Sequence, residues 1–337
     1  HTATDTATAT NTPTNTNTPT NTPTNTPTNT PTSIPPNSMA ECVVTRSTAT
    51  TATFANSHPK VLLNHQATKD CLKQLLTNGV PVATRFKNYV DTQLANGNQW
   101  NYQNWHTALI YQLTNDSKYA IDAVAKVDAY VASEEALISQ GKVPEIAYDH
   151  YLHVGDRLSE VMLVYDWCYE YLTESQRTRW LNFANQAVWN VWNFQQDTWV
   201  SDNVGWAVDN PFNNYYYSFL RATMLVGLAS HGENSQAQTW IDTFRTVKLE
   251  NRLFPAFSAT LQGGGSLEGT GYGISFMNLF QIYDWWERST GERIATRTPH
   301  TLASLGFFIH NIAPTLDRIA PTGDHAREST GAFYDYH

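Results

Sequence analysis

Two stretches of the chain carry residues whose types suit acid–base chemistry beside a carboxylate. The stretch DNPFNNYYYSFLR holds the consecutive amides Asn213 and Asn214. A side-chain amide donates two N–H groups without carrying a competing charge, so it suits the binding of a carboxylate. The stretch LQGGGSLEGTGYG places Glu268 and Tyr272 among six glycines. A tyrosine hydroxyl acts as an acid, and as a base where nearby cations lower its pKa.

Each of these residues also has a purely structural interpretation. Both asparagines could cap a helix that begins near Tyr215, as asparagine commonly does. Tyr272 could be a packed aromatic residue with its hydroxyl at the surface, and Glu268 could cap the helix that follows it. Tyr283 and the tyrosines at 215–217 compete with Tyr272 for a catalytic role.

A further group of polar residues stands just before an expected helix. The stretch DHYLHVGDR contains His150, His153 and Arg157. The planar fork of an arginine pairs well with a substrate carboxylate, although Arg157 could equally form an ion pair with Asp156 or Glu160. These three side chains are therefore candidate substrate-binding residues.

Aromatic residues make up 12% of the chain, with 11 Trp and 17 Tyr, which is enough for some of them to serve outside the core. In the stretch NQWNYQNWH, Trp105 and His106 stand among polar residues. This combination suits flat sugar rings, which present apolar faces and hydroxyl edges. Trp105 is therefore a candidate sugar-binding residue, and His325, in APTGDHARE, is a weaker one.

Helical periodicity recurs from Ser57 onward, whereas strand alternation does not. Thr173 and Gln176 in TESQ form a capping-box pattern, and we expect further helices to start at Asp116 or Ser117, at a Ser235 cap, and over 275–289 and 301–312. Short breaks join the helices, which makes neighbours antiparallel. Because no fixed period marks a solenoid, we predict an all-α fold, an incomplete (α/α) toroid of antiparallel helical hairpins.

The start of the chain has a different composition. Residues 1–38 are almost wholly Thr, Asn, Pro and Ala, with a TNTP repeat, and offer nothing apolar to bury. We expect a disordered or extended linker of the kind that separates modules of exported surface proteins. The boundaries are then 1–56 for the linker and lead-in and 57–337 for the helical domain. Three cysteines define no clear disulfide framework, although Cys42 and Cys71 could pair.

Charge and motif content exclude several classes of function. The formal net charge is -9 and no basic stripe occurs, which argues against a general nucleic-acid partner. No stretch approaches the 18 or so continuous apolar residues of a membrane span, so we expect no membrane insertion. Metal-ligand motifs are also missing, and we expect neither a metal nor another cofactor. The oligomeric state is not indicated.

The order of several motifs resembles the heparinase II/III-like polysaccharide lyases. The motifs are SHPKVLL (57–63), WHTALIYQLTNDSKYAIDAVAKVDAYV (105–131), DRLSEVMLVYDWCYEYLTESQRTRW (156–180), DNPFNNYYYSFLRATMLVGLA (209–229), GGGSLEGTGYG (263–273) and APTGD (320–324). The resemblance covers about residues 57–325. It implies the incomplete α/α toroid of chondroitin AC and alginate lyases, followed by a β-sandwich. We therefore expect this chain to lack the sandwich and to be inactive or weakly active alone.

The resemblance also implies a reaction, the β-elimination of a uronic-acid-containing polysaccharide in an extracellular, cell-surface or periplasmic setting. Such an enzyme removes the C5 proton of a uronate and expels the C4 oxygen, so the neighbouring carboxylate must be neutralised or strongly hydrogen-bonded. The resemblance gives this role to Asn214, with Asn213 close behind, and the acid–base role to Tyr272. Glu268 would orient the sugar. The usual histidine of the family lies in the β-sandwich, which weakens the case for His325.

Two other functions fit the same sequence. A glycoside hydrolase on an α/α toroid needs two carboxylates about 5–10 Å apart across the scissile bond. The available carboxylates are Asp156, Asp166, Glu268 and Asp324, which the sequence does not pair. The other alternative is a non-catalytic carbohydrate-binding module on a cell-surface stalk.

Overall fold

The structure is a computed structural model that describes residues 47–97, 99–199, 205–269, 273–316, 318–320 and 331–332. The expected linker, Tyr272 and His325 lie outside these residues. Within them the fold is all-α, as predicted, apart from two strands of two residues each that pair antiparallel. None of the described helices combines the length and apolarity that a membrane span requires.

The elements follow in this order: α1 (Gln66–Thr77), α2 (Pro81–Asn96), α3 (Asn104–Thr114), α4 (Ser117–Ser139), η2 (Glu145–Ala147), α5 (Tyr148–Tyr151), α6 (Val154–Trp167), η3 (Tyr169–Tyr171), α7 (Glu174–Trp192), η4 (Phe194–Gln196), α8 (Gly205–Val208), α9 (Asn214–Ala229), α10 (Ala237–Asp242), the π-helix η5 (Thr243–Leu253), α11 (Phe254–Thr260), α12 (Gly273–Thr290), α13 (His300–Asn311), β1 (Arg318–Ile319) and β2 (Gly331–Ala332).

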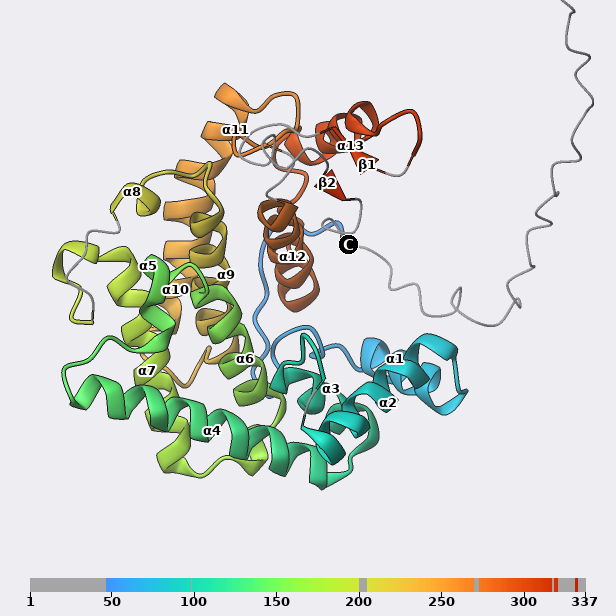
Figure 1. Cartoon of the computed structure of the whole chain (residues 1–337), viewed down its shortest axis with the longest axis vertical. Coiled ribbons are helices and arrows are strands. Elements are labelled where there is room, and N and C mark those ends of the chain that lie inside the picture. The colour runs from blue at the N-terminus through green and yellow to red at the C-terminus, as the bar shows by residue number, and fades with distance from the viewer. Residues whose placement is uncertain are drawn as a thin grey trace, which may run out of the picture.

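The helices form two layers (Figure 1). In the inner layer α1 packs on α3, α3 on α6, α6 on α9 and α9 on α12. The helix that follows each of the first four inner helices packs against it, which gives the pairs α1–α2, α3–α4, α6–α7 and α9–α10. This curved series of antiparallel hairpins is the arrangement of an incomplete (α/α) toroid.

The inner helices α6, α9 and α12 run in the same direction. Gly155, near the start of α6, contacts Ser218 near the start of α9, and Tyr165, near the end of α6, hydrogen-bonds Glu233 just past α9. The ring of Phe54 contacts both His231, just past α9, and Trp286, near the end of α12. The N-terminal ends of three inner helices therefore gather at one end of the layer.

Local sequence signals explain where several helices begin. Thr173 and Gln176 form the predicted capping box of α7, and Asp116 caps α4 by accepting from Lys118 N. The expected cap at Ser235 is wrong, because α10 begins at Ala237 after a turn in which Asn234 Oδ1 accepts from Gln236 N. Every residue of α9 except Tyr215 is buried, as befits a central helix.

The segment just before α1, at residues 60–62, forms hydrogen bonds with the C-terminal ends of the inner helices α6 and α12. Asp166, in the last turn of α6, accepts from the backbone N–H groups of Lys60 and Val61, and the N–H of Leu62 donates to Ser289 Oγ of α12. In the middle of α1, Cys71 is disulfide-bonded, whereas Cys168 is a buried free thiol. This agrees with the possible Cys42–Cys71 pair, although Cys42 itself lies outside the described residues.

Close packing at Gly155 sets the distance between α6 and α9. A Cβ placed on this glycine would lie 2.7 Å from the carbonyl oxygen of Ser218 and 3.0 Å from its Cα, which are backbone atoms that cannot rotate away. The Gly155 N–H also donates to Ser218 Oγ at 2.9 Å. Only glycine allows the two helices to approach this closely at their N-terminal ends.

We predict that Gly155→Ala lowers the free energy of unfolding by about 1–3 kcal/mol, because the added methyl overpacks the contact. Equilibrium denaturation in urea measures this. Gly306→Ala is the matched control, since a Cβ at this helical position of α13 meets nothing within 4 Å. Equal effects of the two substitutions would contradict the close contact.

Candidate functional site

A cluster of polar side chains lies where α6, α9 and α12 begin. At its centre is Arg221 of α9, whose side chain is only 4% exposed. Its Nη2 forms an ion pair with Asp156 of α6, and its Nη1 donates to Asn278 Oδ1 at 2.7 Å and Gln281 Oε1 at 2.9 Å, both on α12. A buried charge is stable only when it is compensated in this way. Arg221 therefore joins three helices by one side chain.

The two asparagines at the start of α9 have different environments. Asn213 is the cap residue, and its Oδ1 accepts from the N–H groups of Tyr215 at 2.9 Å and Tyr216 at 3.3 Å. Asn214 is the first residue of the helix and is 8% exposed, yet no described residue forms a hydrogen bond with its side-chain amide. Asn214 stands seven residues before Arg221, so the two side chains share a helix face about 10 Å apart.

Tyr217 lies between Asn214 and Arg221 on that helix. Burial, together with the neighbouring Tyr283 and the Glu268 carboxylate, raises the pKa of the Tyr217 hydroxyl well above its usual value. The hydroxyl therefore stays protonated at neutral pH. Glu268 accepts from Ser275 Oγ, in the first turn of α12, at 3.0 Å. We call Asp156, Asn214, Tyr217, Arg221, Glu268 and Asn278 the polar cluster.

Two residues predicted from DHYLHVGDR lie beside the polar cluster, and one does not. His153 directly precedes α6, with its Nδ1 3.8 Å from Asp156 Oδ2, and its side chain is 61% exposed. His150 lies in the turn before α6, with its Nδ1 3.9 Å from Asp149 Oδ1. Arg157 instead forms an ion pair with Glu145, so the structure supports neither the expected pairing with Asp156 nor that with Glu160.

Trp105 lies elsewhere in the inner layer. Its Nε1 donates to Gln103 Oε1, and its ring lines an apolar cavity of about 480 Å³ between α1, α3, α6 and α12. Leu109, Leu163 and Trp167 line the same cavity. The structure does not bring Trp105 next to the polar cluster, because Trp167 and Arg288, at the C-terminal ends of α6 and α12, line the same cavity.

The described part of the glycine-rich stretch packs on α13. Gly264 has φ +77°, and a Cβ there would lie 2.2 Å from the backbone of Ala303. A Cβ on Gly265 would lie 2.9 Å from the ring of Phe307, and the Gly265 carbonyl is 3.1 Å from His300 Nε2. The absence of a side chain at these two glycines therefore allows the stretch to lie directly against α13.

Sequence reasoning missed Arg221 and Asn278 and ranked Tyr217 behind Tyr272. The signal was present within NNYYYSFLR, where Asn214, Tyr217 and Arg221 follow the i, i+3, i+7 spacing of one helix face. The contribution of α12 could not be found in the same way, because it depends on which helices become neighbours.

The opposite end of the inner layer carries a second polar network. The imidazole of His58 lies between two carboxylates, with Nδ1 2.5 Å from Asp166 Oδ1 and Nε2 2.7 Å from Glu233 Oε1. Lys60 also pairs with Glu233, and Tyr165 donates to Glu233 Oε2 at 3.0 Å. Because Asp166 belongs to this end of the layer, it does not face Glu268 as a hydrolase pair would require.

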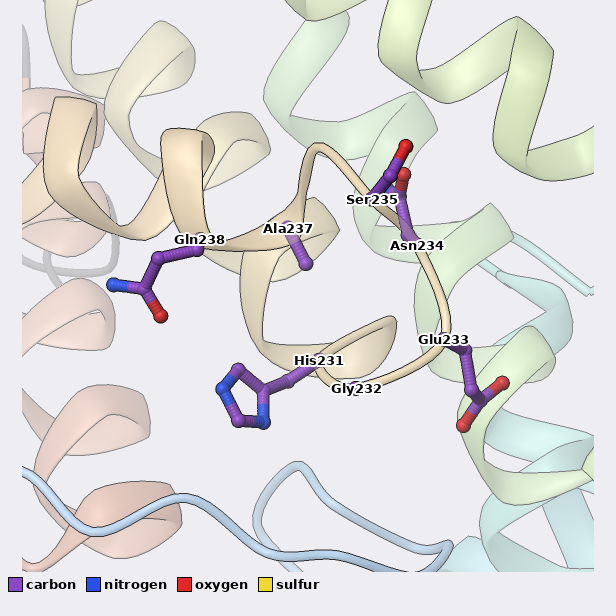
Figure 2. Close-up of a pocket in the computed structure, with 7 residues that line it drawn as sticks. All are labelled: His231, Gly232, Glu233, Asn234, Ser235, Ala237 and Gln238. Carbon is purple, nitrogen blue, oxygen red and sulfur yellow. The ribbon is translucent and has the colours of Figure 1, made fainter.

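The loop after α9, together with the first two residues of α10, borders a hollow of about 380 Å³ (Figure 2). His231 and Gln238 point to one side of the loop, and Glu233 points to the other. Glu233 is used by the His58 network, so this hollow is less suited to catalysis than the polar cluster. No group of three or more metal-ligating side chains occurs among the described residues.

Comparisons with known proteins add no assignment. No protein-family model matches the chain, and no curated protein matches it. Its class is therefore defined by the fold and the site: an all-α, double-layered toroid with a polar cluster at the N-terminal ends of its inner helices.

We predict that His58 makes folding stability depend on pH. Burial lowers the pKa of His58, but its hydrogen bonds to Asp166 and Glu233 outweigh burial and raise the pKa above its usual value. The stabilisation is complete below the unfolded pKa of about 6.5 and is lost as pH rises through the higher folded pKa. His58→Gln should therefore lower the free energy of unfolding by about 3 kcal/mol at pH 6 and less at pH 9.

Urea denaturation at several pH values measures this difference. His65→Gln is the control, because His65 is exposed and makes no side-chain cap contact. A separate loss is expected in acid. Burial opposes ionisation of Glu233, but hydrogen bonds to His58 and Lys60 lower its pKa to about 2, so its contribution disappears only as pH falls toward that value. A constant difference between His58→Gln and the wild type from pH 6 to 9 would contradict the imidazolium bridge.

Proposed function

We propose that this chain is the toroid part of a polysaccharide lyase that cleaves a uronic-acid-containing polysaccharide by β-elimination. The observation that carries the proposal is the side-chain amide of Asn214, which no described residue engages, at the start of a long inner helix. Beside it stand a protonated tyrosine and a carboxylate. The resemblance to the heparinase II/III-like lyases in the order of motifs supports the same assignment.

The amide of Asn214 would hold the uronate carboxylate. Loss of the C5 proton leaves a carbanion whose charge spreads into that carboxylate, and N–H donors placed there favour the charged state. The N-terminus of α9 adds its positive dipole end, which attracts an anion. Asn213 already uses its Oδ1 for the cap, so only Asn214 presents an uncommitted amide oxygen and amino group.

The leaving C4 oxygen needs a proton, and we assign its donation to the hydroxyl of Tyr217, one turn after Asn214 in α9. Its raised pKa keeps the hydroxyl protonated. Tyr272, to which the resemblance gives the acid–base role, would accept the C5 proton as its tyrosinate. His153, next to Asp156, is an exposed imidazole at the edge of the polar cluster. Arg221 would act as a positioning residue, since its Nη groups are occupied by Asp156, Asn278 and Gln281.

Two observations support an extracellular, cell-surface or periplasmic setting. Cys71 is disulfide-bonded, and disulfides persist in oxidising compartments. The Thr/Asn/Pro tract is of the kind found between modules of exported proteins.

We predict that Asn214→Ala lowers kcat about 10²–10³-fold, as expected for loss of one donor to a developing negative charge. The assay follows ultraviolet absorbance of the new C4–C5 double bond, using the full-length protein on a panel of uronate polymers. Asn213→Ser is the control, because serine keeps the cap of α9 and should preserve activity. Cleavage without a double bond would refute the lyase assignment, and full activity of Asn214→Ala would refute the role of this amide.

Removing the Tyr217 hydroxyl tests the proposed acid. Tyr217→Phe should lower kcat about 10²-fold with little change in KM, because general acid catalysis contributes in the transition state. Tyr216→Phe is the control on the same helix, since the Tyr216 hydroxyl donates to Lys248 O of η5 instead. Similar kinetics for the two variants would mean that Tyr217 plays no part in proton transfer.

A further inference from the structure

Beside the polar cluster, a tight turn holds three consecutive residues in an unusual backbone conformation. Asp149, His150 and Tyr151 have φ of +47°, +53° and +64°, in the left-handed region that residues with a side chain rarely occupy. Three such residues in sequence cost free energy and persist only where the surroundings fix them.

Two anchors hold the turn in this conformation. Tyr151 is fully buried, and its hydroxyl donates to Asp197 Oδ2 at 2.7 Å and accepts from Asn190 Nδ2 at 3.3 Å. On the other side, the Tyr215 hydroxyl donates to Asp149 Oδ1 at 3.0 Å. The anchors leave His150 and the second oxygen of Asp149 directed away from the core, since the two side chains are 36% and 57% exposed.

An exposed tryptophan stands against this turn. Trp206 of α8 is 50% exposed, and its ring centroid lies 4.8 Å from that of Tyr215 and 6.2 Å from that of His150, both in edge-to-face geometry. These two ring contacts fix the orientation of the indole, while half of its surface stays open to solvent. Figure 1 places α5 and α8 on the same side of the molecule.

We propose that Trp206, His150 and Asp149 form a subsite for an uncharged pyranose ring next to the uronate held by Asn214. The inference rests on the proposed function and specifies its substrate as a polymer in which uronates alternate with neutral sugars. The indole face receives the apolar face of the ring, and Asp149 and His150 accept from or donate to its hydroxyls. Tyr215, which contacts Trp206, directly follows Asn214 in α9, so the two sugars would bind on adjoining faces of the first turn of this helix.

The charges around Trp206 determine which ring fits. Among the described residues near Trp206, Asp149 and Asp209 carry negative charge, and Arg252 is paired with Asp209 at 3.5 Å. The carboxylate of Asp149 is thus left without a cationic partner apart from His150, 3.9 Å away. A sulphate or second carboxylate on this ring would meet a like charge. A neutral sugar meets no such penalty.

Kinetics of the full-length protein on three polymers test this subsite: unsulphated chondroitin, chondroitin sulphate and polymannuronate. We expect kcat/KM to be highest for the unsulphated alternating polymer. Trp206→Ala should raise KM for it about tenfold with kcat nearly unchanged, whereas Trp206→Phe should retain most of the affinity. Trp100→Ala is the control, because Trp100 is 90% exposed and belongs to the connection between α2 and α3.

The charge argument has a separate test. Asp149→Asn removes the negative charge but keeps a residue type that tolerates the left-handed conformation. It should raise activity on chondroitin sulphate, relative to activity on the unsulphated polymer, at least threefold. A wild type that prefers polymannuronate, or an unchanged KM in Trp206→Ala, overturns the subsite while leaving β-elimination intact. Absence of double-bond formation on every polymer would instead refute the proposed function itself.

Discussion

The arrangement of this site depends on one buried cation. Arg221 is almost fully enclosed, so its charge must be compensated within the protein, and the compensating groups come from two other helices. Asp156 supplies the opposite charge from α6, and Asn278 and Gln281 supply amide oxygens from α12. These contacts require the N-terminal halves of α6, α9 and α12 to converge. Gly155 allows the convergence because it has no Cβ to hold α6 away from α9.

The two ends of the inner layer differ in how completely their polar groups are used. At the C-terminal end, His58 bridges two carboxylates, and Asp166 accepts in addition from two backbone N–H groups. The polar groups at that end therefore stabilise the fold. At the N-terminal end, the side-chain amide of Asn214 forms no hydrogen bond with a described residue, and residues 149–151 are held in a strained turn. Natural proteins satisfy local rules least at functional sites, which is why we place the site at this end.

Sequence reasoning predicted much of the fold, because its signals are local. The capping box at Thr173, the cap at Asp116 and the helix over 301–312 need only neighbouring residues to be recognised. The site was predicted only in part. Asn214 was found from its residue type, but Arg157 was chosen instead of Arg221, because no local pattern tells which arginine faces the neighbouring helices. The position of Trp105 in a cavity between α1, α3, α6 and α12 likewise depends on which helices become neighbours.

The central claim is that the Asn214 amide holds the carboxylate of a uronate, and the side-chain amide signal of this residue tests it most directly. The signal can be identified in a ¹⁵N-resolved NMR spectrum by its loss in Asn214→Ala. We predict that a uronate-containing oligosaccharide shifts this signal, whereas the same oligosaccharide with its carboxylates methyl-esterified leaves it unchanged. Equal shifts with both ligands, or no shift with either at saturation, would contradict the account.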